Sequence, residues 1–123
     1  MNEGTAARLV AVSLDCAEPE SLASFYSALL GGRRLWTKSE SAAVEVAGVV
    51  LVAQRVAGYV PPEWPGSSIV HLDLTADDLD AAARHAVALG ATWPEQPDAR
   101  WHVLLDPAGH PFCLTPFTPD LAL

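Results

Sequence analysis

Apolar and polar positions along the first half of the chain follow the order expected for one strand, one helix and three more strands. Leu9–Asp15 alternates as a half-buried strand does. Apolar residues then recur at helical spacing, which predicts a helix over roughly Glu20–Leu30, with Pro19 suited to its first turn and Gly31 to its end. The three strands predicted after this helix are Arg34–Lys38, Ala42–Val46 and Val49–Val56.

The second half of the chain repeats this order. Ile69–Thr75 alternates, and a helix is predicted over Asp77–Leu89, with Gly90 after its end. The segment Asp106-Pro107-Ala108-Gly109 has Asp, Pro and Gly where a type I turn prefers them, so a tight hairpin is expected there. The short strands predicted after the second helix are Thr92 and Trp93, Trp101–Leu105, and Phe112–Thr115.

The two halves predict one α+β domain over residues 1–123, with eight strands and two helices in two βαβββ modules. Module one takes about residues 7–56 and module two about residues 69–118. A stiff Pro-rich connector, residues 57–68, joins them. One such module cannot bury both its sheet and its helix. Two modules are therefore expected to pack together, with helices outside and a curved mixed sheet around a cleft.

Composition narrows the classes of partner. A net charge of −8 over 123 residues repels phosphate backbones, so a nucleic-acid partner is not expected. The same charge would attract a cationic ligand, although acidic surfaces also serve solubility alone. No apolar stretch is long enough to span a bilayer, and the N-terminus lacks the features of a secretory signal. We therefore expect no membrane partner and a cytoplasmic location.

His102 and Cys113 are a candidate polar pair on the predicted closing hairpin. If Asp106–Gly109 forms a four-residue turn, His102 pairs with Cys113, and both side chains face the cleft near His71. Two histidines and a cysteine suit zinc with an open fourth position. A His–Cys pair also suits nucleophilic catalysis, although the sequence offers no orienting third group. Alternatively, Cys113 is a small buried hydrophobe and the histidines line a polar pocket.

Four tryptophans are many for this length. Trp36, Trp93 and Trp101 are candidates to line the cleft with flat apolar surface, and filling the core is the alternative. Trp64 lies in the connector, where it could cover the cleft mouth or a partner subunit. Asp73 lies two residues after His71 on the same predicted strand face, where it either orients His71 or is simply exposed.

Three segments of the chain resemble the vicinal-oxygen-chelate superfamily of glyoxalase-like and bleomycin-resistance proteins. In chain order they are LDCAEPESLASFYSALLGG, HLDLTADDLDAAARHAVALGA and DPAGHPFCLTP, and the resemblance covers nearly the whole chain. It implies the curved mixed sheet of the glyoxalase/bleomycin-resistance/dioxygenase fold. It also implies a cleft where a divalent metal, held by His and Glu side chains, chelates neighbouring oxygens of a substrate.

The resemblance places the family's metal ligands at positions that mostly hold poor donors in this chain. His71 matches a ligand His, whereas Ala11 and Cys113 stand where the resemblance implies a His and a Glu, and Gln54 is the polar candidate for the fourth position. Alanine has no donor, and a neutral amide suits a transition metal poorly. We therefore predict a degenerate site without a stoichiometric metal. If a metal does bind, His71, His102 and Cys113 are its predicted ligands.

Three functions stay open. The first is a metal-independent binding protein that sequesters a drug or metabolite, as bleomycin-resistance proteins do. The second is a metal-dependent enzyme of lyase, isomerase or dioxygenase type, with an altered site around the three predicted metal ligands. The third is an accessory interaction module. The poor ligand set favours the first, with a flat aromatic or cationic ligand and, by the resemblance, a homodimer. The predicted ligand-binding residues are His71, His102, Cys113, Gln54, Trp36, Trp93 and Trp101.

Overall fold

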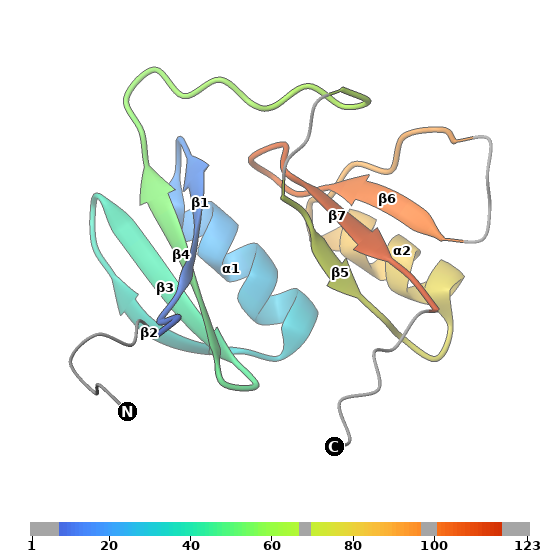
Figure 1. The fold of residues 1–123 in the computed structure, drawn as a ribbon, viewed down its shortest axis with the longest axis horizontal. Coiled ribbons are helices and arrows are strands. Elements are labelled where there is room, and N and C mark those ends of the chain that lie inside the picture. The colour runs from blue at the N-terminus through green and yellow to red at the C-terminus, as the bar shows by residue number, and fades with distance from the viewer. Residues whose placement is uncertain (1–7, 67–69, 97–100, 117–123) are drawn as a thin grey trace, which may run out of the picture.

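A computed structural model of the chain describes residues 8–66, 70–96 and 101–116. Module one holds a four-stranded sheet and one helix, and module two a three-stranded sheet and one helix (Figure 1). In chain order the elements are β1 (Val12–Cys16), α1 (Pro19–Leu30), β2 (Arg33–Thr37), β3 (Ser41–Val46), β4 (Val49–Arg55), β5 (Leu72–Leu74), α2 (Leu79–Leu89), β6 (His102–Leu105) and β7 (Pro111–Leu114).

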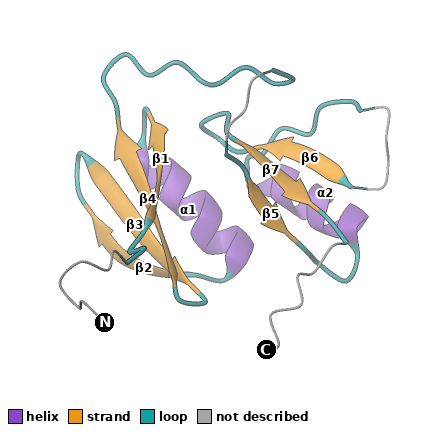
Figure 2. Cartoon of the chain, in the orientation of Figure 1, coloured by secondary structure: helices purple, strands orange, loops and turns teal. Residues whose placement is uncertain are grey.

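The strand pairing repeats between the modules. The first strand of each module pairs in parallel with its last strand, β1 with β4 and β5 with β7, and the other neighbours are antiparallel. The sheet orders are β1-β4-β3-β2 and β5-β7-β6 (Figure 2). The predicted α+β fold built from two related modules is confirmed. In the described residues, its strands form two separate mixed sheets.

Eight strands were predicted, and the described residues form seven. The missing strand is reduced to a single bridge between Thr92 and Leu105. The cause lies just beyond it, where Pro94 has no N–H to donate to a ladder. The side chain of Gln96 then takes the place of a neighbouring strand. Its Oε1 accepts from Val103 N at 2.9 Å, and its Nε2 donates to Val103 O at 2.8 Å.

Both helices begin and end close to the predicted positions, because their ends are specified locally. Pro19 opens α1, and Gly31 follows it with a φ of 68°, a left-handed conformation that glycine adopts freely. The side chain of Asp78 caps α2 by accepting a hydrogen bond from Ala81 N at 3.0 Å. Neither helix is long and apolar enough to cross a membrane.

One hydrophobic core runs through both modules. The two helices contact each other, and Phe112 of β7 reaches across to α1. Its ring lies 5.8 Å from that of Phe25 and 6.3 Å from that of Tyr26, measured between ring centres. Tyr26 also donates a hydrogen bond of 2.6 Å from its hydroxyl to Asp106 Oδ2, beside β6. The hairpin of module two is therefore fastened to the helix of module one.

Candidate functional site

A cavity of about 440 Å³ lies on the face of the second sheet that points away from α2. Asp73 and Val103 both pair with Cys113, so these three side chains share one face and form the cavity floor. Their neighbours along the same strands point to the opposite face and join the hydrophobic core beneath α2. These neighbours are Leu72, Leu74, Leu104, Phe112 and Leu114. The other residues that line the cavity are Trp64, Pro65, Gly66, His71, Trp101, Pro111 and Thr115.

The connector reaches this cavity because it is anchored on the hairpin turn of module two. Tyr59 donates from its hydroxyl to Ala108 O at 2.6 Å. Pro61 packs so closely on Gly109 that a Cβ added to the glycine would lie 2.7 Å from the proline's Cβ. These contacts bring the following segment, with Trp64, to the cavity wall.

His71, Asp73 and Cys113 form a polar cluster inside the cavity. His71 Nδ1 lies 3.0 Å from Asp73 Oδ1 and 3.8 Å from Cys113 Sγ. Burial, and then the Asp73 carboxylate, raise the pKa of the Cys113 thiol, so it stays protonated at neutral pH. Asp73 and Cys113 both approach the same imidazole nitrogen, whereas a nucleophile relay needs one partner on each nitrogen. The cluster therefore does not have the geometry of an activated cysteine nucleophile.

The structure places His102 on the opposite face of the second sheet from Cys113. His102 pairs with Leu114 of β7, so the predicted pairing with Cys113 is wrong by one residue. A shift of one residue turns a strand's side chains to the other face. His102 Nε2 lies 2.6 Å from Asp80 Oδ1 on α2, and its ring packs edge-on against Trp93, with ring centres 4.8 Å apart. Neither His102 nor Trp93 is among the residues that line the cavity.

The cause of this shift is the hairpin turn. The prediction paired Leu105 with His110 across a four-residue turn, but Leu105 pairs with Pro111. Asp106 and His110 already face each other, because Asp106 N donates to His110 O at 2.9 Å. The loop between them has three residues and ends in Gly109 at a φ of 89°, the conformation that closes a three-residue hairpin loop.

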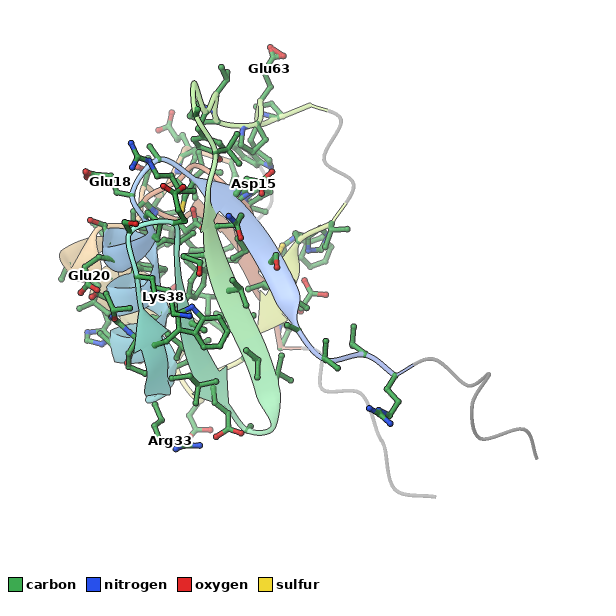
Figure 3. The ribbon with its side chains drawn as sticks, turned by 90° about the vertical axis from the view of Figure 1, so that its left-hand side faces the viewer. Asp15, Glu18, Glu20, Arg33, Lys38 and Glu63 are labelled. Atoms are coloured by element: carbon green, nitrogen blue, oxygen red, sulfur yellow. The ribbon has the colours of Figure 1, made fainter. Side chains whose placement is uncertain are left out.

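Gln54 and Trp36 lie on the first sheet, on its face away from α1, and do not line the cavity. Gln54 pairs with Ser41 and with Asp15, so these polar residues share that face. Trp36 donates from Nε1 to Ser41 Oγ at 3.0 Å. Gln54 donates from Nε2 to Glu40 O at 3.2 Å. Figure 3 looks onto this sheet from the side opposite module two, with Asp15 labelled.

Matching hydrogen bonds show which positions of the two modules correspond. In each module, the residue after the last strand donates its N–H to the final residue of the first strand. These bonds are Val56 N to Cys16 O and Thr115 N to Leu74 O. Cys113 lies two residues before Thr115 and therefore corresponds to Gln54, which lies two residues before Val56. His71 lies three residues before Leu74 and therefore corresponds to Ser13, which lies three residues before Cys16. The predicted counterpart of His71, Ala11, is therefore wrong by two residues.

Sequence reasoning found part of the cavity and missed part of it. His71, Cys113 and Trp101 were predicted to line the cleft, and they do line the cavity. Asp73 was set beside His71 by its two-residue spacing, but it was not counted as a metal donor. Nothing in the sequence signalled Val103, because its place on the floor follows from the hairpin register.

Comparisons with known proteins agree with this fold. The family model described as a glyoxalase-like domain matches residues 11–115. No curated protein matches the chain by sequence. Among solved structures, a glyoxalase/bleomycin resistance protein/dioxygenase family enzyme from Burkholderia phytofirmans is similar, with 18% identity, 88% of this chain and 97% of that chain covered, and a TM-score of 0.69.

Two further solved structures are similar over most of their length. A mutant of the fosfomycin resistance protein FosX from Listeria monocytogenes, complexed with Mn(II) and 1S,2S-dihydroxypropylphosphonic acid, has 15% identity, 94% of each chain covered and a TM-score of 0.69. A glyoxalase-related enzyme from Fulvimarina pelagi has 20% identity, 89% of this chain and 87% of that chain covered, and a TM-score of 0.65.

The residues of this chain do not fit a hard cation such as Mn(II) at the positions implied by the resemblance. Hard six-coordinate cations favour several oxygen ligands, especially carboxylates. Of the corresponding positions in the two modules, His71 and Cys113 offer a nitrogen and a sulfur, and Ser13 and Gln54 lie on the other sheet. Asp73 supplies the one carboxylate among the described residues of the cavity.

Proposed function

The chain belongs to the glyoxalase-like domain family of the vicinal-oxygen-chelate superfamily, and on that premise we propose that it binds a small molecule in the cavity of module two. The observation that carries this proposal is the cavity itself, which combines an apolar wall with a few polar groups on its floor. Such a combination is typical of small-molecule sites. Sequestration of a drug or metabolite needs no more than this binding.

The lining favours a flat ligand that carries a positive charge. Trp64 and Trp101 offer aromatic surface, and Val103 and Pro111 add apolar surface. The carboxylate of Asp73 lies on the floor, and none of the described lining residues is Lys or Arg. The net charge of −8 would speed the encounter with a cation. We therefore propose an aromatic ring system bearing a cationic group as the ligand class.

An acridinium dye, which is flat and cationic, is expected to bind and to quench tryptophan fluorescence. Replacing Trp101 with Ala should weaken dye binding by roughly tenfold, as expected for the loss of one aromatic contact. Replacing Asp73 with Asn should weaken binding of the cationic dye more than that of a neutral acridine. His102→Gln is the matched control, because His102 lies on the far face of the same sheet. Equal affinity of all four proteins for the dye would refute this proposal.

We also propose that two copies associate so that the first sheet of one chain completes the cavity of the other. Within one chain, the cavity has no lining residue from module one, and the outer face of the first sheet carries Ser13, Val52 and Gln54 without a covering element among the described residues. That face corresponds by internal repeat to the cavity floor. A second copy would therefore bring together two matching half-sites.

Light scattering should give twice the 13.0 kDa mass of one chain at micromolar concentration. Val52→Lys places a charge in the middle of the proposed interface and should shift the protein to monomer, because burying an unpaired charge is costly. Val60→Lys is the control, since Val60 is 79% exposed in the connector. A monomer mass for the unmodified chain contradicts the homodimer.

A metal-dependent enzyme with an altered site is the second candidate function. The observation in its favour is the cluster of His71, Asp73 and Cys113, whose donor atoms all lie within 4.8 Å of one another. His102 has no part in it, because it faces α2. Mass spectrometry of a ligand released from the protein separates the two functions: an unchanged ligand indicates sequestration, and a converted one indicates catalysis.

A further inference from the structure

We propose that His71, Asp73 and Cys113 together bind a thiophilic divalent cation, with zinc as the chemical type. This site differs from the predicted ligand set, because Asp73 takes the place of His102. It also replaces the expectation that the chain holds no stoichiometric metal, which rested on counting His71 as the one good donor. The inference rests on a different observation from the organic ligand proposed above, but both ligands would use the Asp73 carboxylate, so zinc is expected to compete with a cationic dye.

The spacing of the three donor atoms suits a small tetrahedral cation. Zn–S bonds of about 2.3 Å and Zn–N bonds of about 2.0–2.1 Å place neighbouring ligand atoms of a tetrahedron about 3.3–3.6 Å apart. His71 Nδ1 lies 3.0 Å from Asp73 Oδ1 and 3.8 Å from Cys113 Sγ, and all three atoms lie within 4.8 Å of one another. Shifts of a few tenths of an ångström in the first two distances, together with a closer approach of the Asp73 carboxylate to Cys113 Sγ, would meet this geometry.

This cluster differs from an ordinary hydrogen-bonded pair because three potential ligand atoms approach one another at a single point. The Nδ1 atom of His71 can donate one proton, and the carboxylate of Asp73 at 3.0 Å is the better acceptor for it. The sulfur of Cys113 nevertheless approaches the same nitrogen. A cation between the three side chains would be bound by the nitrogen, the carboxylate oxygen and the sulfur at once. The thiol proton would be released to solvent as the sulfur binds.

The strands hold the three ligands in place. Asp73 of β5 and Cys113 of β7 are direct partners in the parallel pair, and His71 lies two residues before Asp73 on the same face. All three line the cavity, so a cation can reach them from solvent. Three protein ligands leave a fourth tetrahedral position open, as in catalytic zinc sites.

The donor types decide which cation binds. Thiolate and imidazole favour zinc and its probes cobalt and cadmium, whereas manganese and magnesium favour oxygen ligands. We therefore expect the chain to bind zinc much more tightly than manganese. This is the reverse of what a site made of carboxylates would show.

Cobalt(II) tests the site directly in full-length, untagged, metal-stripped protein. One equivalent should produce the near-ultraviolet charge-transfer band of a cobalt–thiolate bond, and zinc should abolish the band by displacement. Cys113→Ser should remove the band. Cys113→Ser and Asp73→Asn should each weaken zinc binding by roughly ten- to a hundredfold, at least what the loss of a supporting residue costs. Manganese, followed by its electron paramagnetic resonance signal, should stay free.

Two controls show whether the cobalt band arises at this cluster. His102→Gln should leave the cobalt band unchanged, because His102 lies on the opposite face. In the unmodified protein, zinc but not manganese should protect Cys113 from alkylation, a measurement that needs no folded variant. No band, an unchanged band in Cys113→Ser, or loss of the band in His102→Gln would each overturn the proposal. Dye binding is read by fluorescence in the metal-stripped protein, so failure of either proposal leaves the other testable.

Discussion

Replacing Asp106 with Ala is expected to lower the free energy of unfolding by about 3–5 kcal/mol, the cost of breaking a buried hydrogen-bonded carboxylate site. Asp106 is 3% exposed. Its carboxylate accepts hydrogen bonds from the Tyr26 hydroxyl at 2.6 Å, from Ala108 N at 2.9 Å and from His110 N at 3.0 Å. Alanine would leave these donors without their acceptor. Urea denaturation followed by far-ultraviolet circular dichroism measures the change.

Asp106→Asn is the matched variant, since it keeps the shape and one acceptor oxygen. Burial raises the pKa of Asp106 in the folded protein above its ordinary value of 3.8, while the hydrogen bond from Tyr26 partly offsets this rise. The folded state then holds the Asp106 proton more tightly than the unfolded state does. The stabilisation that this tighter proton binding gives to the folded state is complete below pH 3.8, and it is lost as the pH rises through the raised pKa of Asp106.

Asparagine carries no such proton, so the stability of the natural chain minus that of Asp106→Asn should fall as the pH rises through this acidic window. Above the window the difference should be constant. Urea titrations of both proteins at a series of pH values provide the measurement. A difference that stays flat, or that grows as the pH rises through the window, would contradict the proposed burial of the charge.

Phe112→Ala is expected to destabilise the protein by about 3–5 kcal/mol, the usual cost of deleting a buried aromatic ring. Phe112 is fully buried on β7, and its ring contacts Phe25 and Tyr26 of the other module. Phe112→Leu keeps much of the volume and should cost about 1 kcal/mol.

This contact also links the unfolding of the two modules. Because the core is shared, we expect one cooperative transition, with tryptophan fluorescence and circular dichroism giving the same midpoint in urea. The Phe112→Ala variant should shift both midpoints together. Two separate transitions in the unmodified chain would show that each module unfolds as its own unit.

The Asp106 hydrogen bonds matter for the cavity as well as for stability. They fix the three-residue hairpin loop, and the loop fixes the register of β6 against β7. That register turns Val103 toward the cavity and His102 toward α2. Variants of Asp106 that still fold therefore provide a second test of the binding site, because a loosened hairpin should weaken dye binding more than zinc binding, whose ligands lie on or next to the β5–β7 pair.

The sequence by itself determined the elements whose causes are local. Helical spacing together with Pro19, Gly31 and Gly90 located both helices to within about two residues, because caps and turns act over one turn of chain. Alternation located most of the strands, and the repeat of the two halves indicated the modular fold. His71 and Cys113, which the resemblance singled out, and Trp101, one of four tryptophans considered for the cleft, all line the cavity.

Only the tertiary structure decided which side chains meet. A hairpin register depends on the loop conformation, and one residue of error moved His102 from the core side to the cavity in the prediction. Likewise, the Gln96 side chain stands where a strand was expected, and the anchored connector brings Trp64 to a wall contributed by distant strands. Such contacts join residues far apart along the chain, and a one-dimensional pattern of polar and apolar positions does not record the distances between them.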